Sequence, residues 1–152
     1  MVDLVHQMKF SGRTDIAATL GTEAALRIKD QPGVKECSAV IPVPLHPIRI
    51  RERGYDQNLV IARNVAGVLN LPLLPHLLRR TRNTPPQSRL SDRERRKSLQ
   101  DAFEPIASNV SYHEAKMLLI DDVIHTGATA KGCIAALNRI GIRDVMTLAA
   151  CG

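Results

Sequence analysis

The sequence predicts an α/β fold with a mainly parallel central sheet flanked by helices. Two short apolar runs, 39–41 and 117–120, are typical of strands that are covered on both faces. Each run is followed, after a polar segment, by apolar residues at helical spacing, within 58–69 and 130–140. Strands that alternate with helices in this way indicate βα units, whose strands lie parallel.

The first half of the chain predicts helices on both sides of one strand. Apolar residues at a period of 3.6 indicate the helices, and a β-rich run that ends in prolines indicates the strand. In order, we expect a short helix within 1–10, a packing helix over 15–28, a strand over 37–43, a loop over 45–57 and a helix over 58–69.

The second half predicts the remaining strands of the sheet and one more helix. The central strand is its most apolar segment, and a glycine closes the helix that follows it. In order, we expect a short strand over 77–80, another over 102–106, the central strand over 116–123, a helix capped at Gly141 and a last strand over 145–148.

Two carboxylates and a small loop follow the central strand. Asp121 and Asp122 end its apolar run, and His125-Thr126-Gly127-Ala128-Thr129 opens the next helix. In open α/β sheets, ligands bind beyond the carboxyl ends of the strands, and a helix amino terminus offers unpaired N–H groups to a phosphate. The carboxylates suit the vicinal hydroxyls of a ribose, or a hard divalent cation held partly through water. The motif therefore indicates a sugar-phosphate site, and a solvated acidic turn is the alternative.

Basic residues are concentrated in one segment. The formal net charge is +6, and residues 79–97 contain eight basic and two acidic side chains, which account for all of it. Pro85 and Pro86 exclude a regular helix or a central strand there, so we expect a mobile basic loop. Three more arginines lie between residues 49 and 53. Such clusters attract polyanions, either pyrophosphate or a nucleic-acid backbone.

Length and composition indicate one soluble domain. The 152 residues suit a single domain, residues 1–152. No apolar run approaches the roughly 18 residues that span a bilayer, and the amino terminus lacks a signal-peptide pattern, so we expect a cytoplasmic protein without a membrane segment. The three cysteines, Cys37, Cys133 and Cys151, lie far apart without metal-ligand spacing, and we interpret them as buried thiols.

The central motif resembles the signature of type I phosphoribosyltransferases, which bind phosphoribosyl pyrophosphate. The shared pattern is an apolar strand, two aspartates and then Thr-Gly-Ala-Thr. The resemblance implies a phosphoribosyltransferase-like fold in which Asp121 and Asp122 hold the ribose hydroxyls. Residues 125–129 would then wrap the 5′-phosphate, with His125 at a position where many of these proteins have a small residue.

Over nearly its whole length the sequence resembles the ComF family of competence proteins, which is related to GntX. Members often begin with a small zinc ribbon built from paired cysteines, and we expect this chain to lack it. The stretches that carry the resemblance, besides the central motif, are Lys9-Phe10-Ser11-Gly12-Arg13, Pro42-Val43-Pro44-Leu45-His46-Pro47, Arg51-Glu52-Arg53-Gly54-Tyr55-Asp56-Gln57 and Thr84-Pro85-Pro86-Gln87.

The resemblance also implies how the ligand is held. It implies a phosphoribosyl transfer with inversion at C1 and Mg²⁺ on the pyrophosphate, with Asp121 and Asp122 as candidate ligands of the metal. A flexible basic loop that contains Gln87, Arg93 and Arg96 would close over the site. The loop that holds the pyrophosphate would include Leu45, His46, Arg49, Arg51 and Arg53.

Two other functions remain open at this stage. ComF proteins are associated with the uptake of transforming DNA, which implies single-stranded DNA and a competence helicase as partners along the basic surface. Against this stands a small set of aromatic side chains for base stacking: Phe10, Tyr55, Phe103 and Tyr112. The second of these functions is a non-catalytic protein that senses phosphoribosyl pyrophosphate. The sequence names neither the acceptor of the phosphoribosyl group nor the oligomeric state, and it leaves a homo-oligomer open.

Overall fold

The computed structural model describes residues 12–83, 102–106, 112, 114–124 and 126–151. Its elements follow the order predicted from the sequence, with two short helices in addition. They are α2 (Thr14–Ile28), α3 (Pro32–Lys35), β1 (Cys37–Pro42), α4 (Pro47–Arg53), α5 (Gln57–Leu69), β2 (Leu78–Arg80), β3 (Phe103–Pro105), β4 (Lys116–Val123), α7 (Ala128–Asn138) and β5 (Asp144–Cys151).

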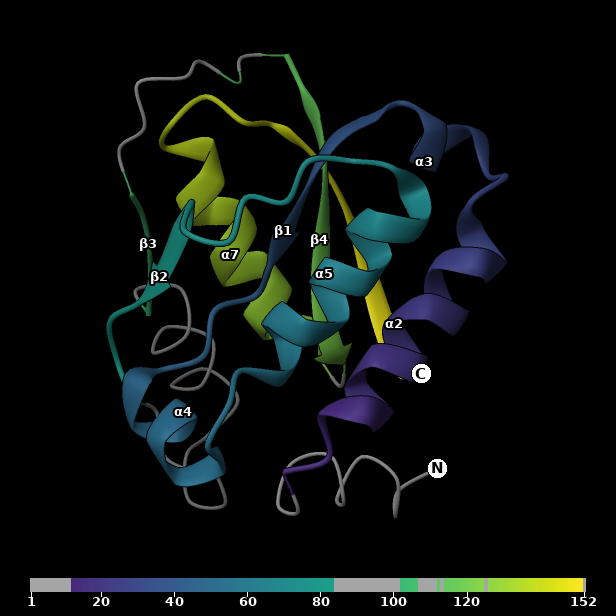
Figure 1. Cartoon of the computed structure of the whole chain (residues 1–152). Coiled ribbons are helices and arrows are strands. Elements are labelled where there is room, and N and C mark those ends of the chain that lie inside the picture. Colours follow the sequence, from purple (N-terminus) through teal and green to yellow (C-terminus); the bar gives the residue numbers. More distant parts are fainter. Residues whose placement is uncertain (1–11, 84–101, 107–111, 113, 125, 152) are drawn as a thin grey trace.

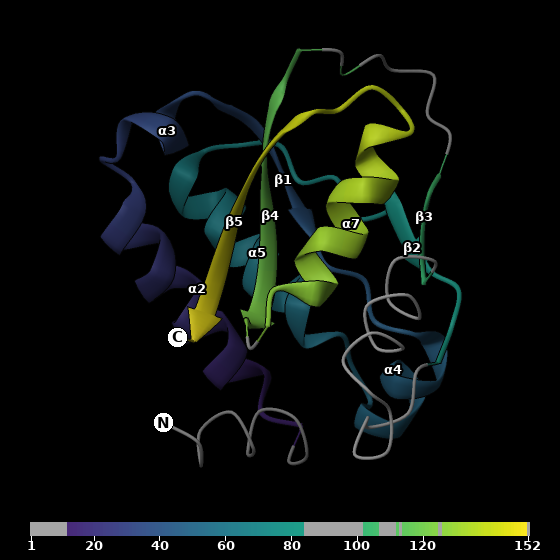
Figure 2. The same ribbon diagram turned by 180° about the vertical axis from the view of Figure 1, so that it is seen from behind.

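The central sheet has three parallel strands in the order β1-β4-β5. In its register Ile41 lies opposite Leu119, and Asp121 lies opposite Ala149. Helix α7 covers one face, and α5 with α2 covers the other (Figures 1 and 2). The prediction of a mainly parallel sheet flanked by helices is therefore confirmed.

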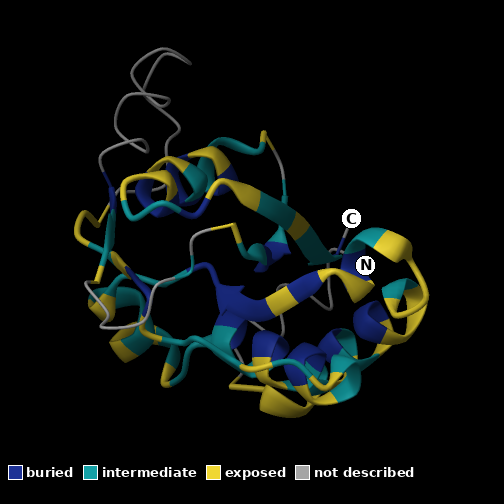
Figure 3. Ribbon diagram, turned by 90° about the horizontal axis from the view of Figure 1, so that it is seen from above, coloured by how far each residue is buried: buried dark blue, intermediate teal, exposed yellow. Residues whose placement is uncertain are grey.

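Strand β4 divides the core into two clusters. Its side chains alternate between the two faces of the sheet, as in any β-strand. Met117 and Leu119 pack in the cluster beneath α7, whereas Leu118 and Ile120 pack in the cluster beneath α5 and α2. All four are almost completely buried, and Figure 3 shows buried residues gathered between the layers. Covering on both faces explains why the strand reads as a continuous apolar run.

The two short predicted strands form a hairpin-like pair outside the central sheet. Strands β2 and β3 are antiparallel, with Leu78 opposite Pro105 and Arg80 opposite Phe103. Phe103 is fully buried in the cluster beneath α7 and fixes this pair to the rest of the molecule. The basic loop predicted between them lies outside the described residues, as does the short helix predicted within 1–10.

The prediction of a loop over 45–57 is wrong in its central part, because helix α4 forms there. His46 caps the helix, since its Nδ1 accepts a hydrogen bond from the backbone N–H of Ile48, and Pro47 occupies the first helical position. Gly54 ends the helix in the left-handed conformation at φ 80°. The capping residues were present in the sequence, but the helix buries no residue and so has no apolar periodicity.

Smaller differences lie at element ends. The helix expected to be capped at Gly141 ends earlier, at Asn138, with Arg139 as its C-cap, and Gly141 lies in the following turn at φ 86°. The short helix α3 was not predicted. All three cysteines are buried thiols that form no disulfide bond with one another, as interpreted from the sequence. Across the described residues, we find no helix with the length and apolar character to cross a membrane.

Candidate functional site

The candidate site lies at the carboxyl edge of the sheet, at the bottom of Figure 1. The ends of β1 and β4, helix α4, and the amino termini of α5 and α7 lie at this edge. Parallel strands all end on the same side, so the segments that follow them are brought together there. This is where the sequence predicted the acidic pair, the phosphate loop and the pyrophosphate loop.

The two carboxylates of the acidic pair, Asp121 and Asp122, are almost buried, at 8% and 7% exposure. Asp121 Oδ1 accepts the backbone N–H of Asp122 at 2.9 Å, and Asp122 Oδ1 accepts that of Val123 at 2.8 Å. By the alternation of β4, Asp121 is in phase with Leu119 and Asp122 with Ile120.

The first turn of α5 supplies side-chain donors to both carboxylates. Gln57 Nε2 donates to Asp122 Oδ2 at 3.2 Å. Asn58 Nδ2 donates to Asp121 Oδ1 at 3.3 Å and to the carbonyl oxygen of Val43 at 2.9 Å. Asn58 therefore links the ends of β1 and β4 to the start of α5.

Burial also changes the acidity of the pair. Burial and, after it, the neighbouring charge of Asp122 together raise the pKa of Asp121 from the ordinary 3.8 to about 7, against the hydrogen bonds from Asp122 N–H and Asn58. Asp121 therefore exchanges its proton near neutral pH. A group that donates to Asp121, or a cation beside it, favours the ionised carboxylate.

A pocket of ≈ 160 Å³ joins Asp121 to the amino terminus of α7. Gly127 is the N-cap of α7 at φ 68° and provides no side-chain hydrogen bond to the helix. Apart from the N–H of Ala128, which Thr126 Oγ1 accepts, no described side chain engages the first N–H groups, so these and the positive dipole end can face an anion. The pocket is smaller than the roughly 300–1,000 Å³ of drug-sized ligand sites, and suits one small anionic group. It is lined by Asp121, Val123, Ile124, Thr126, Gly127, Ala128, Thr129 and Ala130.

The predicted phosphate loop and this pocket therefore largely coincide. Thr126, Gly127, Ala128 and Thr129 line the pocket as a loop that wraps a phosphate requires. Thr126 Oγ1 also accepts the backbone N–H of Ala128 at 3.4 Å. His125 lies outside the described residues.

The residues of the predicted pyrophosphate loop lie at the same edge but have different environments. Leu45 and His46 are half-buried, and the imidazole of His46 is engaged in capping α4. Arg49 Nη1 pairs with Glu52 Oε2 at 2.8 Å, and Arg51 is exposed. Arg53 is half-buried. Gln87, Arg93 and Arg96 of the predicted flexible loop lie outside the described residues.

Arg80 joins the basic side of the site, although the sequence did not single it out. Its guanidinium lies over the ring of Phe103, 5.4 Å from the centroid, and its Nε donates to the carbonyl oxygen of Arg82. Burial lowers the pKa of Arg80; the charge of Asp121 opposes this, and those of Arg49 and Arg53 add to it. The charges of Arg49, Arg53 and Asp121 thus all act on Arg80, and these three arginines are here called the arginine cluster.

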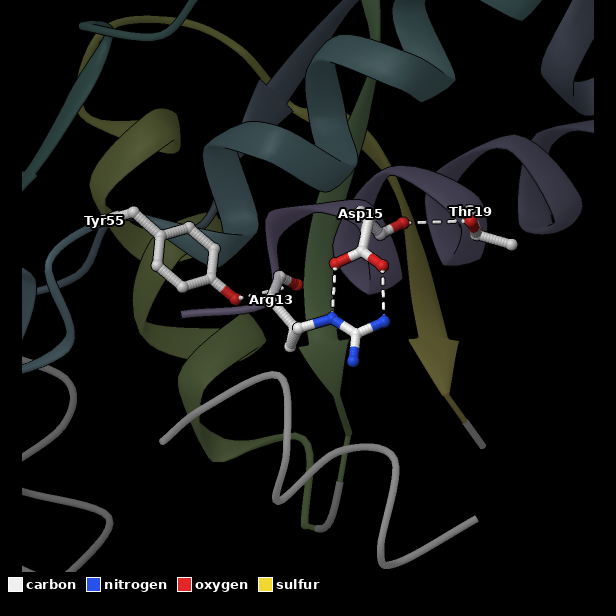
Figure 4. A network of polar contacts seen from close by, with 4 residues as sticks. All are labelled: Arg13, Asp15, Thr19 and Tyr55. Atoms are coloured by element: carbon white, nitrogen blue, oxygen red, sulfur yellow. Dashed lines mark hydrogen bonds and ion pairs between the residues drawn. The ribbon is translucent and has the colours of Figure 1, made fainter. Parts of the chain in front are cut away.

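Tyr55 fixes the segment between α4 and α5 to the start of α2 (Figure 4). Its hydroxyl donates to the carbonyl oxygen of Arg13 at 3.5 Å, and Arg13 forms two hydrogen bonds, of 2.8 and 2.6 Å, with the carboxylate of Asp15. Thr19 Oγ1 donates to the carbonyl oxygen of Asp15. These contacts hold the residues just before Gln57 and Asn58 in place.

Three site residues were missed by the sequence analysis, and each carried a signal. Gln57 and Asn58 lie on the same helical face as the buried Ile61 and Ala62, so they are polar side chains at apolar positions. Arg80 follows the buried Leu78 by two residues in β2, which places it on the inner side of that strand. In both cases the periodicity of the element would have shown a polar group that points inward.

The residues present suit a metal bound jointly with a ligand better than a site made by the protein alone. In the described part of the chain, no group of three or more His, Cys, Asp or Glu side chains is arranged to hold a metal ion. Mg²⁺ is usually held by one or two carboxylates together with substrate phosphates and water. Asp121 and Asp122 fit that requirement in number and ligand type.

Comparisons with known proteins give several relatives, although no protein-family model matches the chain. It is 30% identical over 145 residues to competence protein F of Haemophilus influenzae, covering 93% of this chain and 63% of that protein. It is 31% identical over 151 residues to DNA utilization protein YhgH of Escherichia coli O157:H7, covering 97% of this chain and 65% of that protein. The chain thus spans less than two thirds of the length of these relatives.

Proposed function

The chain belongs to the ComF family, and from this premise we propose that it binds phosphoribosyl pyrophosphate at the carboxyl edge of its sheet, in a fold of the type I phosphoribosyltransferase kind. The observation that carries the proposal is a single pocket that has a buried carboxylate, Asp121, at one side and the amino terminus of α7 at the other. An acceptor of hydroxyl protons beside a phosphate-binding helix end is the combination that a ribose phosphate requires.

The 5′-phosphate is assigned to the pocket at α7. Gly127 at φ 68° allows the backbone to turn so that the N–H groups of the first helical turn face the pocket. The pocket volume of ≈ 160 Å³ supports one phosphate rather than a whole nucleotide. The acidic pair is then left for the ribose hydroxyls, because each carboxylate has about four lone-pair positions and the backbone and carboxamide donors occupy only some of them.

The pyrophosphate is assigned to the arginine cluster. The charges of Arg49, Arg53 and Asp121 all act on Arg80, and guanidinium groups bind phosphate oxygens in a bidentate manner. Mg²⁺ would be held by Asp121 and Asp122 together with the ligand, and would reduce the charge of the pyrophosphate. If transfer occurs, a nucleophilic atom of the acceptor forms a bond to C1 with inversion while the C1–O bond to pyrophosphate breaks, and the cluster stabilises the departing pyrophosphate anion.

The test is a calorimetric titration of phosphoribosyl pyrophosphate with Mg²⁺ into the wild type and into Asp121→Asn/Asp122→Asn. We expect binding by the wild type and its loss in the double variant. Asp144→Asn is the matched control, because this exposed carboxylate begins β5 at the opposite edge of the sheet. Unchanged binding by the double variant would contradict the proposal. Pyrophosphate release across a panel of nitrogenous bases then separates an enzyme from a sensor.

A second candidate function, binding of single-stranded DNA, is favoured by the names of the relatives, a competence protein and a DNA utilization protein, and by exposed arginines. Arg51, Arg79 and Arg82 are exposed on α4 and near β2, where a nucleic-acid backbone is able to reach them. Phe103 is fully buried, so this aromatic ring offers no stacking platform. A steep fall of oligonucleotide affinity with salt, unaffected by the Asp121→Asn/Asp122→Asn change, would support this function over the first.

A further inference from the structure

Gln57 and Asn58 occupy positions where packing alone favours apolar side chains. Both are 1% exposed, on the face of α5 that also carries Ile61, Ala62 and Val65. That face packs against the sheet, and helix faces of this kind are normally apolar. A structural role limited to filling space does not account for two carboxamides in succession.

Their nitrogen atoms are directed at the acidic pair. The Gln57 Nε2 to Asp122 Oδ2 distance is 3.2 Å, and the Asn58 Nδ2 to Asp121 Oδ1 distance is 3.3 Å. Each carboxylate also accepts one backbone N–H, from Asp122 and Val123 respectively. Each carboxylate is thus held from the strand and from the helix, which restricts its rotation about the side-chain bond.

The carboxamide oxygen atoms of Gln57 and Asn58, by contrast, gain no stabilising hydrogen bond. Within the described residues, Gln57 Oε1 and Asn58 Oδ1 are buried and have no hydrogen-bond partner. A buried acceptor without a partner is destabilising, and an apolar side chain of similar size would avoid that cost. The donor groups, rather than the bulk of the side chains, are therefore what these positions require.

We propose that Gln57 and Asn58 are positioning residues that hold Asp122 and Asp121 in the orientation that accepts the ribose hydroxyls. They do not contact the ligand themselves. This inference rests on the proposed function, because it assigns the sugar end of the same site. The two carboxamides thus belong to the sugar end of the site. Within the described residues, their side chains form no hydrogen bond with α7, where the phosphate end lies.

The experiment compares two probes, ribose 5-phosphate and inorganic phosphate, in calorimetric titrations of the wild type, Gln57→Met and Asn58→Leu. Both replacements keep the approximate volume and remove the donor. We expect each variant to bind ribose 5-phosphate roughly tenfold more weakly, because a hydrogen bond to a charged group is lost. Affinity of Gln57→Met for inorganic phosphate should not change, because Gln57 donates to Asp122, which does not line the pocket at α7.

Asn64→Leu is the matched control on the same helix, because Asn64 Nδ2 donates to the Val60 carbonyl oxygen and not to the pair. Equal weakening for both probes would show a structural role and overturn the inference, as would full ribose 5-phosphate affinity in a folded Gln57→Met. Asn58 also donates to the carbonyl oxygen of Val43, so Asn58→Leu loses a second hydrogen bond. If that variant does not fold, the result for Gln57→Met tests the inference. A wild type that binds neither probe overturns the proposed function itself, and with it this inference.

Discussion

Asp121 meets two opposing demands, because the burial that fixes it also disfavours its charge. Its carboxylate is 8% exposed beside a second aspartate, yet it has its full capacity to accept hydrogen bonds from a sugar only when it is ionised. Burial and the adjacent charge raise its pKa, while donors from α5 and the backbone oppose the shift. We therefore expect the pair to cost stability, which is common where a fold holds a functional site.

The first prediction concerns the pH dependence of that cost. Because the pKa of Asp121 is about 7 in the folded state and 3.8 is its ordinary value, the native state binds the extra proton between these values, and stability falls as pH rises through that window. Asp121→Asn should therefore melt roughly 3–9 °C higher at pH 8, for a gain of about 1–3 kcal/mol. The gain should vanish near pH 4. Thermal unfolding by circular dichroism checks this, and an equal gain at both pH values would refute it.

The second prediction concerns the backbone of the phosphate loop at Gly127. A Cβ at this position would meet no described atom within 4 Å. The free-energy cost of adding a side chain is therefore the cost of holding a non-glycine residue at φ 68°. Gly127→Ala should destabilise by about 1–2 kcal/mol. Gly127→Asn should cost less, because asparagine enters the left-handed region more readily. Chemical denaturation measures both, and an equal cost for the two variants would show that another contact is responsible.

At the scale of elements, α2 and α5 form one layer because a glycine allows their backbones to approach. A Cβ added at Gly21 of α2 would lie 2.6 Å from the carbonyl oxygen of Ile61 in α5. The same α5 begins with Gln57 and Asn58, so the packing of α2 on α5 contributes to where these carboxamides lie. The layer behind the sheet is thus connected to the acidic pair.

The third prediction tests this packing. Gly21→Ala should destabilise by about 1–3 kcal/mol, because the helices must separate to admit the methyl group. Gly67→Ala, in α5 with nothing within 4 Å of the added Cβ, should instead stabilise by about 0.4–1 kcal/mol. Denaturant unfolding distinguishes the two. Stabilisation by both variants would mean that the close contact at Gly21 relaxes without cost.

Much of the fold was predictable from the sequence, and the exceptions have physical causes. The apolar run of β4 and the helical period of α5 report burial, which periodicity records directly. Helix α4 was not predicted, because it buries no residue and depends on caps at His46 and Gly54. The acidic pair and the predicted phosphate loop are contiguous in sequence, and Asp121 and residues 126–129 line one pocket. Gln57 and Arg80 were missed because their partners, Asp122 and Phe103, are distant in the chain.

At the scale of the whole molecule, the carboxyl edge of the sheet combines an acidic centre with a basic side. Asp121 lines the pocket at the amino terminus of α7, and its charge also acts on Arg80 of the arginine cluster. A ligand with hydroxyls at its middle and phosphates at both ends matches this order of charges. The fourth prediction follows from it: a phosphoribosyl pyrophosphate site engages α7, the acidic pair and the cluster together, whereas a purely polyanionic ligand engages only the basic side.

The measurement that tests this most directly is an NMR titration of the ¹⁵N-labelled 16.7 kDa chain with phosphoribosyl pyrophosphate and Mg²⁺. We predict that the largest amide shifts occur at Gly127, Ala128 and Thr129 and at Asp122, and that Asp121→Asn/Asp122→Asn abolishes them. A folded protein whose shifts are confined to exposed arginines of α4 and β2, with the amides of α7 unmoved at saturation, would contradict the account.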